Sequence, residues 1–215
     1  MRIADCRTFW SLAMVTLICT AGHVSVLAGG CAVSDGSELP SEDGCMLAFM
    51  YNQTGNHRLV VIDEKNRRRY EAPLDNAGMA PFWEGGKVYV VGVSGSVQGF
   101  AVGKEKLVPE KAEAISEEVV REVAYSRSQH RLYLIQTGFD DHRKIFYELS
   151  VIDFPARKTL WTKRIDDTGL LTIMDRYVCV TGLRLVEVFG CDTGEKIGTT
   201  TVAKLATSAD ARAHE

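Results

Sequence analysis

The chain has 215 residues, of which 46% are hydrophobic and 25% are charged, and it contains five prolines, so its composition is that of a globular protein rather than of low-complexity chain. The formal net charge of −3 gives no basic bias toward nucleic acid, and there is no acidic tail of a solvating kind. Without the first thirty residues, about 185 remain, which is enough for one well-buried domain.

The N-terminal segment has the pattern of an export signal. Two arginines, Arg2 and Arg7, precede an apolar run from Phe9 to Gly30, and small residues surround its exit at Ala-Gly-Gly-Cys-Ala. A basic region, an apolar region and a small-residue exit are typical of a cleaved signal peptide, which we predict over residues 1–30. A retained membrane anchor is the alternative, since about 20 apolar residues can span a bilayer.

The end of this segment, from Leu27 to Cys31, resembles a bacterial lipobox, in which the cysteine is lipidated and becomes the new N-terminus. It departs from that pattern at Ala28, where the family prefers a branched aliphatic residue. Residues 31–45 are mostly small and polar, which predicts a flexible tether. We therefore expect lipidation at Cys31 and a place at the cell envelope. Simple secretion into the periplasm or the medium is the alternative.

Two of the six cysteines, Cys6 and Cys19, lie in the predicted signal peptide. Beyond Cys31, the others are Cys45, Cys179 and Cys191, and their wide spacing lacks the close pairs of a zinc site. In an oxidising compartment one disulfide among these three is expected, with the pairing left open. Buried free thiols are the alternative.

After Cys45 the chain consists of short apolar or alternating runs separated by Gly, Asn, Asp and charged residues, which predicts an all-β fold. In the first half, strands are predicted over residues 46–51, 58–63, 68–72, 79–83, 87–93 and 97–102. In the second half, they are predicted over residues 120–126, 131–137, 146–154, 159–165, 170–174, 176–181, 185–189 and 196–202.

One stretch breaks this rhythm. Residues 104–118 are rich in charge and contain Pro109, and Ala112 and Ile115 begin a helical spacing that continues to Val119. This predicts a short helix or an elaborated loop between strands. The last residues, 204–215, are predicted to form a frayed tail.

Four similar units recur along the body. Their landmarks are the runs Leu59–Asp63, Val97–Val102, Leu149–Phe154 and Leu185–Phe189, at intervals of roughly 37 to 52 residues. Repeats of this length with three or four strands each are typical of β-propellers, because one small sheet cannot bury both of its faces alone.

Particular residues also resemble known propeller repeats. The run from Gly86 to Phe100 is similar to the strand–Gly–strand core of the pyrroloquinoline-quinone-type repeat, and Val120–Leu134 is similar to the WD40 and YVTN types. The resemblance implies an all-β propeller-like domain over residues 46–203, with about four antiparallel blades of three or four strands. Such a chain forms a small ring, an incomplete arc, or half of a ring completed by a second copy, that is, a homo-oligomer.

Two charged clusters are candidate sites. Asp140, Asp141 and His142 offer metal ligands or an acid–base pair, but adjacent residues of one loop seldom converge on an ion, so a solvated loop tip is the expectation. The run Arg67, Arg68 and Arg69 could bind a phosphate or an acidic partner, although charge of this kind also protects the edge of a sheet. We retain both clusters as candidate partner-binding loops.

No catalytic residue, metal or cofactor is predicted. Ser94 and Ser96 do not fit the Gly-x-Ser-x-Gly pattern of a nucleophile, and the adjacent cysteines that quinone dehydrogenases of the propeller family use are missing. We expect instead that the aromatic residues at alternating strand positions pack between blades; these are Tyr89, Phe100, Tyr133, Phe154, Trp161 and Phe189.

Together these patterns predict an exported, lipid-anchored and non-catalytic propeller that acts as a protein-interaction scaffold. Its expected partner is an envelope protein or a cell-surface polymer, and not nucleic acid. One alternative is a small hydrolase, lyase or quinoprotein-like enzyme. The other is a secreted sensor or inhibitor that binds one protein through residues 104–118 and 138–144.

Overall fold

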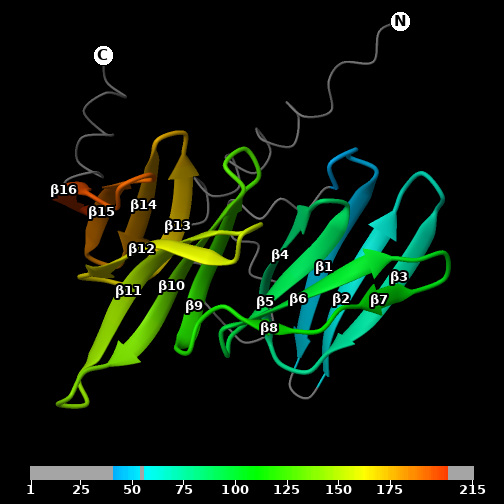
Figure 1. Cartoon of the computed structure of the whole chain (residues 1–215), viewed down its shortest axis with the longest axis horizontal. Helices are drawn as coiled ribbons and strands as arrows, with labels where there is room; N and C mark the ends of the chain where they lie inside the picture. The colour runs from blue at the N-terminus through cyan, green and yellow to red at the C-terminus, as the bar shows by residue number, and fades with distance from the viewer. Residues whose placement is uncertain (1–40, 54–55, 203–215) are drawn as a thin grey trace, which may run out of the picture. The chain divides into compact units, whose positions relative to one another are not determined.

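The computed structural model describes residues 41–53 and 56–202, which form sixteen β-strands in four antiparallel sheets (Figure 1). The predicted signal peptide, Cys31 and the predicted tail over residues 204–215 lie outside the described residues. In the described range, no helix has the length and hydropathy to cross a bilayer. The all-β prediction is confirmed.

Sheets A and B come from the first half of the described chain. Sheet A contains β1 (Met46–Gln53), β2 (Asn56–Asp63) and β3 (Arg68–Leu74), in that order. Sheet B contains β4 (Gly78–Glu84), β5 (Lys87–Gly92), β6 (Ser96–Val102) and β7 (Leu107–Pro109), and the short β8 (Glu113–Ala114) also pairs with β6.

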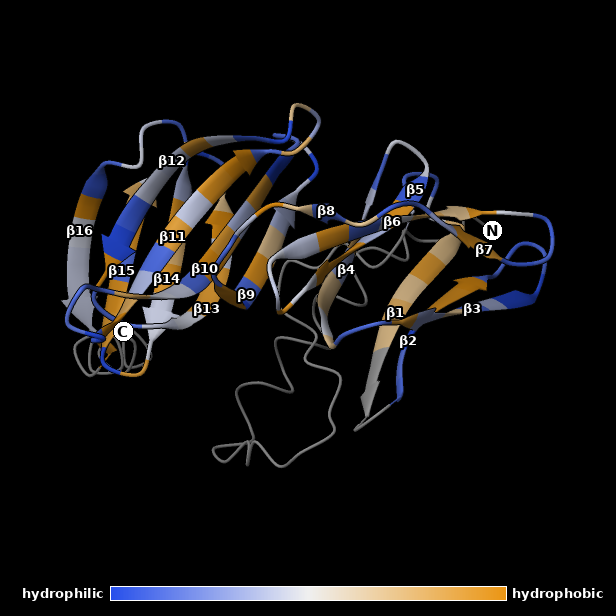
Figure 2. Ribbon diagram, turned by 60° about the horizontal axis from the view of Figure 1, so that its bottom comes forward, coloured by the Kyte–Doolittle hydropathy of each residue, from blue (hydrophilic) through white to orange (hydrophobic). Residues whose placement is uncertain are grey.

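Sheets C and D come from the second half, and each has four strands. Sheet C contains β9 (Val119–Ser126), β10 (Arg131–Phe139), β11 (Ile145–Asp153) and β12 (Lys158–Ile165). Sheet D contains β13 (Gly169–Met174), β14 (Tyr177–Gly182), β15 (Leu185–Gly190) and β16 (Lys196–Thr201). In Figure 2 the second part of β16 is pale because its last four residues are Gly and Thr.

The charged stretch over residues 104–118 is not helical, so the helical alternative was wrong. Leu107 is buried in the apolar core, and the three residues of β7 pair with Phe100–Val102 of β6. Beyond Pro109 the Glu110 N–H still donates a hydrogen bond to the Gly99 carbonyl oxygen at 2.8 Å, so the register with β6 extends one residue past β7. Two short edge strands in a loop therefore replace the helix.

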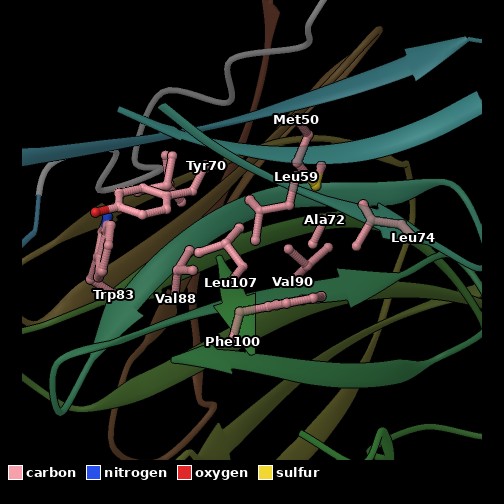
Figure 3. Packing of buried hydrophobic residues seen from close by; sticks show 12 residues of the cluster. Met50, Leu59, Tyr70, Ala72, Leu74, Trp83, Val88, Val90, Phe100 and Leu107 are labelled. Atoms are coloured by element: carbon pink, nitrogen blue, oxygen red, sulfur yellow. The ribbon is translucent and has the colours of Figure 1, made fainter. Parts of the chain in front are cut away.

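The sheets pack against one another in chain order through three apolar cores. The core between sheets A and B is seen in Figure 3, where Met50, Leu59 and Tyr70 of sheet A lie with Val90 and Phe100 of sheet B. A second core joins sheets B and C, and a third joins sheets C and D. Sheets B and C are thus covered on both faces. One face of sheet A and one face of sheet D belong to no core of the described residues.

Sheet A lacks the counterpart of the first strand of the other sheets in the described part of the chain. The repeat landmarks fall on the third strand of sheets B, C and D (β6, β11 and β15) but on the second strand of sheet A (β2). The first strands β4, β9 and β13 contact one another in turn, and β3 contacts the outer strand β7, although β1 also contacts β4. By the landmarks and the β3–β7 contact, strands β1 to β3 correspond to the last three strands of a four-stranded blade.

Aromatic rings join sheets B and C. Phe154, at the end of β11, meets Phe82 and Tyr89 of sheet B edge-on at ring-centroid distances of 4.9 and 4.8 Å. The Arg157 guanidinium lies 3.6 Å from the centre of the Phe154 ring, in a cation–π contact. The predicted packing role of the six aromatic residues is confirmed, since each belongs to one of the three cores or packs against it.

The hairpin between β4 and β5 turns through two glycines, both with positive φ (57° for Gly85 and 73° for Gly86). Two-residue hairpin loops favour this backbone because its twist matches that of the strands. We expect Gly86→Ala to lower the free energy of unfolding by about 1–2 kcal/mol, because a side chain disfavours this conformation. Urea denaturation measures this, with Gly198→Ala in β16 as the control, since a Cβ at Gly198 meets no atom within 4 Å. Equal losses in both variants would contradict the explanation.

Candidate functional site

The run of three arginines lies at the turn between β2 and β3 and is used to hold the fold. Arg67 adopts a positive φ of 53° in the turn. Arg68 donates a hydrogen bond to the Lys104 carbonyl oxygen at 2.7 Å, which links sheets A and B, and Arg69 forms an ion pair with Glu71 at 2.6 Å. The guanidinium groups of Arg68 and Arg69 therefore have separate partners, and they do not form one basic site.

Asp140, Asp141 and His142 lie at the tip of the β10–β11 hairpin. Asp140 Oδ1 accepts hydrogen bonds from the backbone N–H groups of His142 and Lys144, at 2.9 and 2.8 Å, so this carboxylate shapes the turn. No group of three His, Cys, Asp or Glu residues in the described ranges could hold a metal ion. The strand residues beside the tip, Phe139 and Ile145, are exposed apolar side chains.

We expect Asp140→Ala to lower the free energy of unfolding by about 1 kcal/mol, because two backbone N–H groups lose their acceptor. Asp141→Ala at the same tip is the matched control and should be close to neutral. Amide hydrogen exchange should also become faster at Lys144 in the Asp140 variant. A loss that is equal in both variants would mean that the charge of the tip, rather than the turn, is what matters.

The three described cysteines are free thiols in this structure. Cys45 lies just before β1 in sheet A, whereas Cys179 and Cys191 lie in and after the central strands of sheet D. Burial raises the pKa of the Cys179 thiol, and the neighbouring Cys191 adds a smaller effect in the same direction. The raised pKa makes this thiol a poor nucleophile at neutral pH. A disulfide among the three stays a prediction for oxidised protein.

A polar group that sequence reasoning missed lies between sheets B and C. Glu84, at the end of β4, accepts a hydrogen bond from the Tyr125 hydroxyl at 2.5 Å, and its other carboxylate oxygen lies 2.8 Å from His130 Nδ1. The three residues come from separate strands and turns, so no local motif marks them. A carboxylate beside an imidazole can orient an acid or a base. Here, however, both carboxylate oxygens are occupied by groups of the neighbouring sheet, which indicates a structural tie.

Glu122 in β9, the first strand of sheet C, is a second such residue. It is half-buried, and its Oε1 atom is enclosed without a hydrogen-bond partner among the described residues. This burial raises the pKa of the Glu122 carboxyl to about 7, because the charged form loses its hydration. The group therefore changes charge near neutral pH.

A hollow lined partly by polar side chains is small. It lies at the junction of β3 and β4 beside β6, has a volume of about 120 Å³, and is lined in part by Asp75, Asn76, Ser96 and Gln98. Gln98 Nε2 already donates to the Glu110 carbonyl oxygen at 3.2 Å. Pockets for cofactors and drug-sized ligands measure about 300–1,000 Å³, so this hollow does not fit them.

The uncovered face of sheet D is the feature best suited to binding. Side chains alternate across a strand, and Leu171, Val178 and Phe189 point toward sheet C. The opposite face is formed, by strand register, by Leu170, Thr172, Met174, Tyr177, Cys179, Thr181, Val186, Val188, Gly198 and Thr200. We call this set the D face. It contains no charged residue. Leu170, Met174 and Tyr177 on it are 59%, 46% and 44% exposed, whereas Cys179 and Val186 on the central strands are buried.

The charged groups of sheet D lie on its other side or at its edge. Glu187 points toward sheet C and is buried, and its charge is balanced by Lys196 Nζ at 2.6 Å. The same ammonium group contacts Asp166 at 3.0 Å, in the loop that leads into sheet D. These ion pairs keep charge away from the D face, which stays apolar and small-polar.

Four antiparallel sheets, stacked in chain order and joined by short turns, define a β-propeller fold. No protein-family model matches the chain, and no curated protein matches its sequence. Solved structures do resemble it. Sqt1 from Saccharomyces cerevisiae has a TM-score of 0.53 at 10% identity, with 71% of this chain and 44% of that chain covered.

Two further structures have the same degree of likeness. The Cps50 (Swd1) β-propeller domain of Myceliophteria thermophila has a TM-score of 0.51 at 14% identity and covers 70% of this chain and 50% of its own. A chain of the mitotic checkpoint complex has a TM-score of 0.51 at 14% identity, with 76% and 51% covered. The chain thus spans about half the length of these structures, and the likeness shows the fold.

Proposed function

We propose that the protein is an exported, non-catalytic β-propeller module that binds another protein at the cell envelope, to which Cys31 anchors it through lipid. The observation that carries the binding role is the D face, an uncharged sheet surface with three large exposed apolar side chains. Contiguous apolar patches on a folded surface mark sites of association.

The composition of the D face supports a protein partner rather than a charged polymer. Interface centres are depleted in charge and enriched in aromatic residues and methionine. The D face has Met174 on β13 and Tyr177 on β14. A polyanion or an acidic polysaccharide would instead require lysine or arginine, and the D face has neither.

The hairpin tip of sheet C supports a second contact region. Phe139 and Ile145 face each other across β10 and β11 and are 62% and 58% exposed, with Arg143 and Lys144 beside them. This tip overlaps residues 138–144, the loop predicted to bind in the sensor or inhibitor alternative. It stays secondary because two side chains offer a smaller apolar area than the D face.

Site-specific photo-crosslinking in the producing cell tests the binding role. A photoreactive amino acid at Met174 should yield a discrete crosslinked protein species, whereas the same group at Val108 should yield none. Val108 is also exposed but lies on the outer strand β7 of sheet B, away from the D face. A third arm at Phe139 tests the hairpin tip. No crosslinked species at Met174, or an equal pattern at Val108, would overturn the binding role of this face.

Export and lipid anchoring are tested separately. The leader pattern and the lipobox-like end at Cys31 support export and lipidation. Mass spectrometry of the mature protein should show a lipid-modified cysteine at its N-terminus, and Cys31→Ala should release the protein from the membrane fraction. An unmodified mature N-terminus after Gly30 or Ala32 would overturn the anchor and leave the binding role untouched.

A further inference from the structure

We infer that the partner of the D face is the uncovered face of sheet A in a second copy of this chain. This inference rests on the proposed binding role of the D face. It follows from the direction in which the sheets stack and from the residues on the two uncovered faces.

Each sheet presents one face to the sheet before it and one to the sheet after it. Sheet B packs toward sheet A with Trp83 and Val88, and toward sheet C with Phe82 and Val97. We call the face toward the following sheet the forward face and the face toward the preceding sheet the backward face. The cores between A and B, B and C, and C and D each join a forward face to a backward face. The D face is the forward face of the last described sheet, so its natural counterpart is a backward face.

The uncovered face of sheet A is a backward face of suitable chemistry. By strand register it presents Leu47 and Phe49 from β1 next to Val60 and Ile62 from β2. Leu47, Phe49 and Val60 are half-buried, and Ile62 is 36% exposed. None of the four belongs to a core of the described residues. We call these four residues the A face.

Charge on this side of sheet A comes from Arg58 near the start of β2 and from Arg69 and Glu71 of β3, so two guanidinium groups share one carboxylate. Glu71 of β3 forms ion pairs with Arg58 at 2.9 Å and with Arg69 at 2.6 Å. On the D face the exposed apolar side chains also lie on the first two strands of the sheet, β13 and β14. The outer strand β16 presents Gly198 and Thr200. The apolar parts can therefore meet if Arg58 and Arg69, which are 49% and 65% exposed, stay in solvent at the edge of the contact.

Two copies related by a twofold axis form this contact twice, because the D face of each copy meets the A face of the other. The smaller face sets the size of the contact, and three strands of sheet A with six residues per strand measure about 14 Å by about 20 Å. Two such contacts bury on the order of 1,100 Å² in total, which exceeds the roughly 1,000 Å² expected of a specific interface. The contact is thus large enough to hold a dimer.

Sedimentation of the purified, naturally processed protein tests the inference with three variants. Wild type should sediment as a dimer. Leu170→Lys on the D face and Ile62→Lys on the A face should each raise the dimer dissociation constant at least tenfold. Val108→Lys on β7 should leave it unchanged. Far-UV circular dichroism equal to that of the Val108 variant shows that each variant is folded.

A mixture of the two interface variants gives the most specific test of the D-to-A contact. In a mixture of Leu170→Lys and Ile62→Lys, the intact D face of one chain can meet the intact A face of the other, so dimer should partly return. If Ile62→Lys alone stays dimeric, the D faces pair with each other and the inference fails. If wild type is monomeric while Met174 crosslinks to a different protein, the inference also fails but the proposed binding role stands.

Discussion

Replacing Phe154 by alanine should lower the free energy of unfolding by about 3–5 kcal/mol, which is the usual cost of removing a buried phenylalanine. Phe154 is 1% exposed and contacts three aromatic rings: those of Phe82 and Tyr89 in sheet B and that of Tyr125 in its own sheet. Its removal leaves a cavity at the junction of sheets B and C and deprives Arg157 of the ring on which it lies.

Urea denaturation monitored by tryptophan fluorescence measures this loss. Phe139→Ala is the matched control, because Phe139 is an exposed phenylalanine of the same sheet, and its replacement should change the free energy of unfolding by less than about 0.5 kcal/mol. A loss below about 1 kcal/mol at Phe154 would contradict the role of this aromatic cluster in joining the two sheets.

Replacing Glu122 by glutamine should stabilise the protein at alkaline pH and have little effect at acid pH. Glu122 has a pKa of about 7 in the folded protein, against an ordinary value of 4.5. Between pH 4.5 and pH 7 the folded state therefore holds a proton that the unfolded state has released, so stability falls as pH rises through this window. Glutamine resembles the protonated carboxyl and carries no such penalty.

The difference between wild type and the Glu122→Gln variant should be near zero at pH 4 and reach about 1–3 kcal/mol at pH 8, once partial solvent access is allowed for. Thermal unfolding at a series of pH values measures it. Glu148→Gln is the control, because that carboxylate already accepts a hydrogen bond from Gln136. A constant difference across the pH range would show that Glu122 acts through its shape and not through its charge.

The sequence was sufficient to predict the repeating sheets. Alternating apolar residues and Gly- or Asp-containing turns are local signals, and the predicted strands agree with the observed strands to within a few residues. The landmark runs proved more informative than expected, because they fall on equivalent strands and so reveal which strand sheet A lacks. The helical alternative for residues 104–118 failed because Leu107 enters the core and β6 has edge positions that pair with β7 and β8.

The candidate site was less predictable, because its features depend on tertiary contacts. Glu84, Tyr125 and His130 are far apart or separated by a turn in the sequence, and only the packing of sheets B and C brings them together. The D face has an ordinary strand pattern. Its importance arises because no described sheet covers it, which no local pattern can show.

Oxidation of Met174 by dilute hydrogen peroxide, followed by peptide mass spectrometry, tests most directly whether the D face is an occupied interface. Met174 lies on the D face, whereas Ile62 lies on sheet A at the other end of the stack. In wild-type protein Met174 should be oxidised slowly, and in the Ile62→Lys variant it should be oxidised several-fold faster, because the covering copy is lost. Met50, which is buried in the core between sheets A and B, should be oxidised slowly in both. Equal oxidation rates of Met174 in the two proteins would contradict the account.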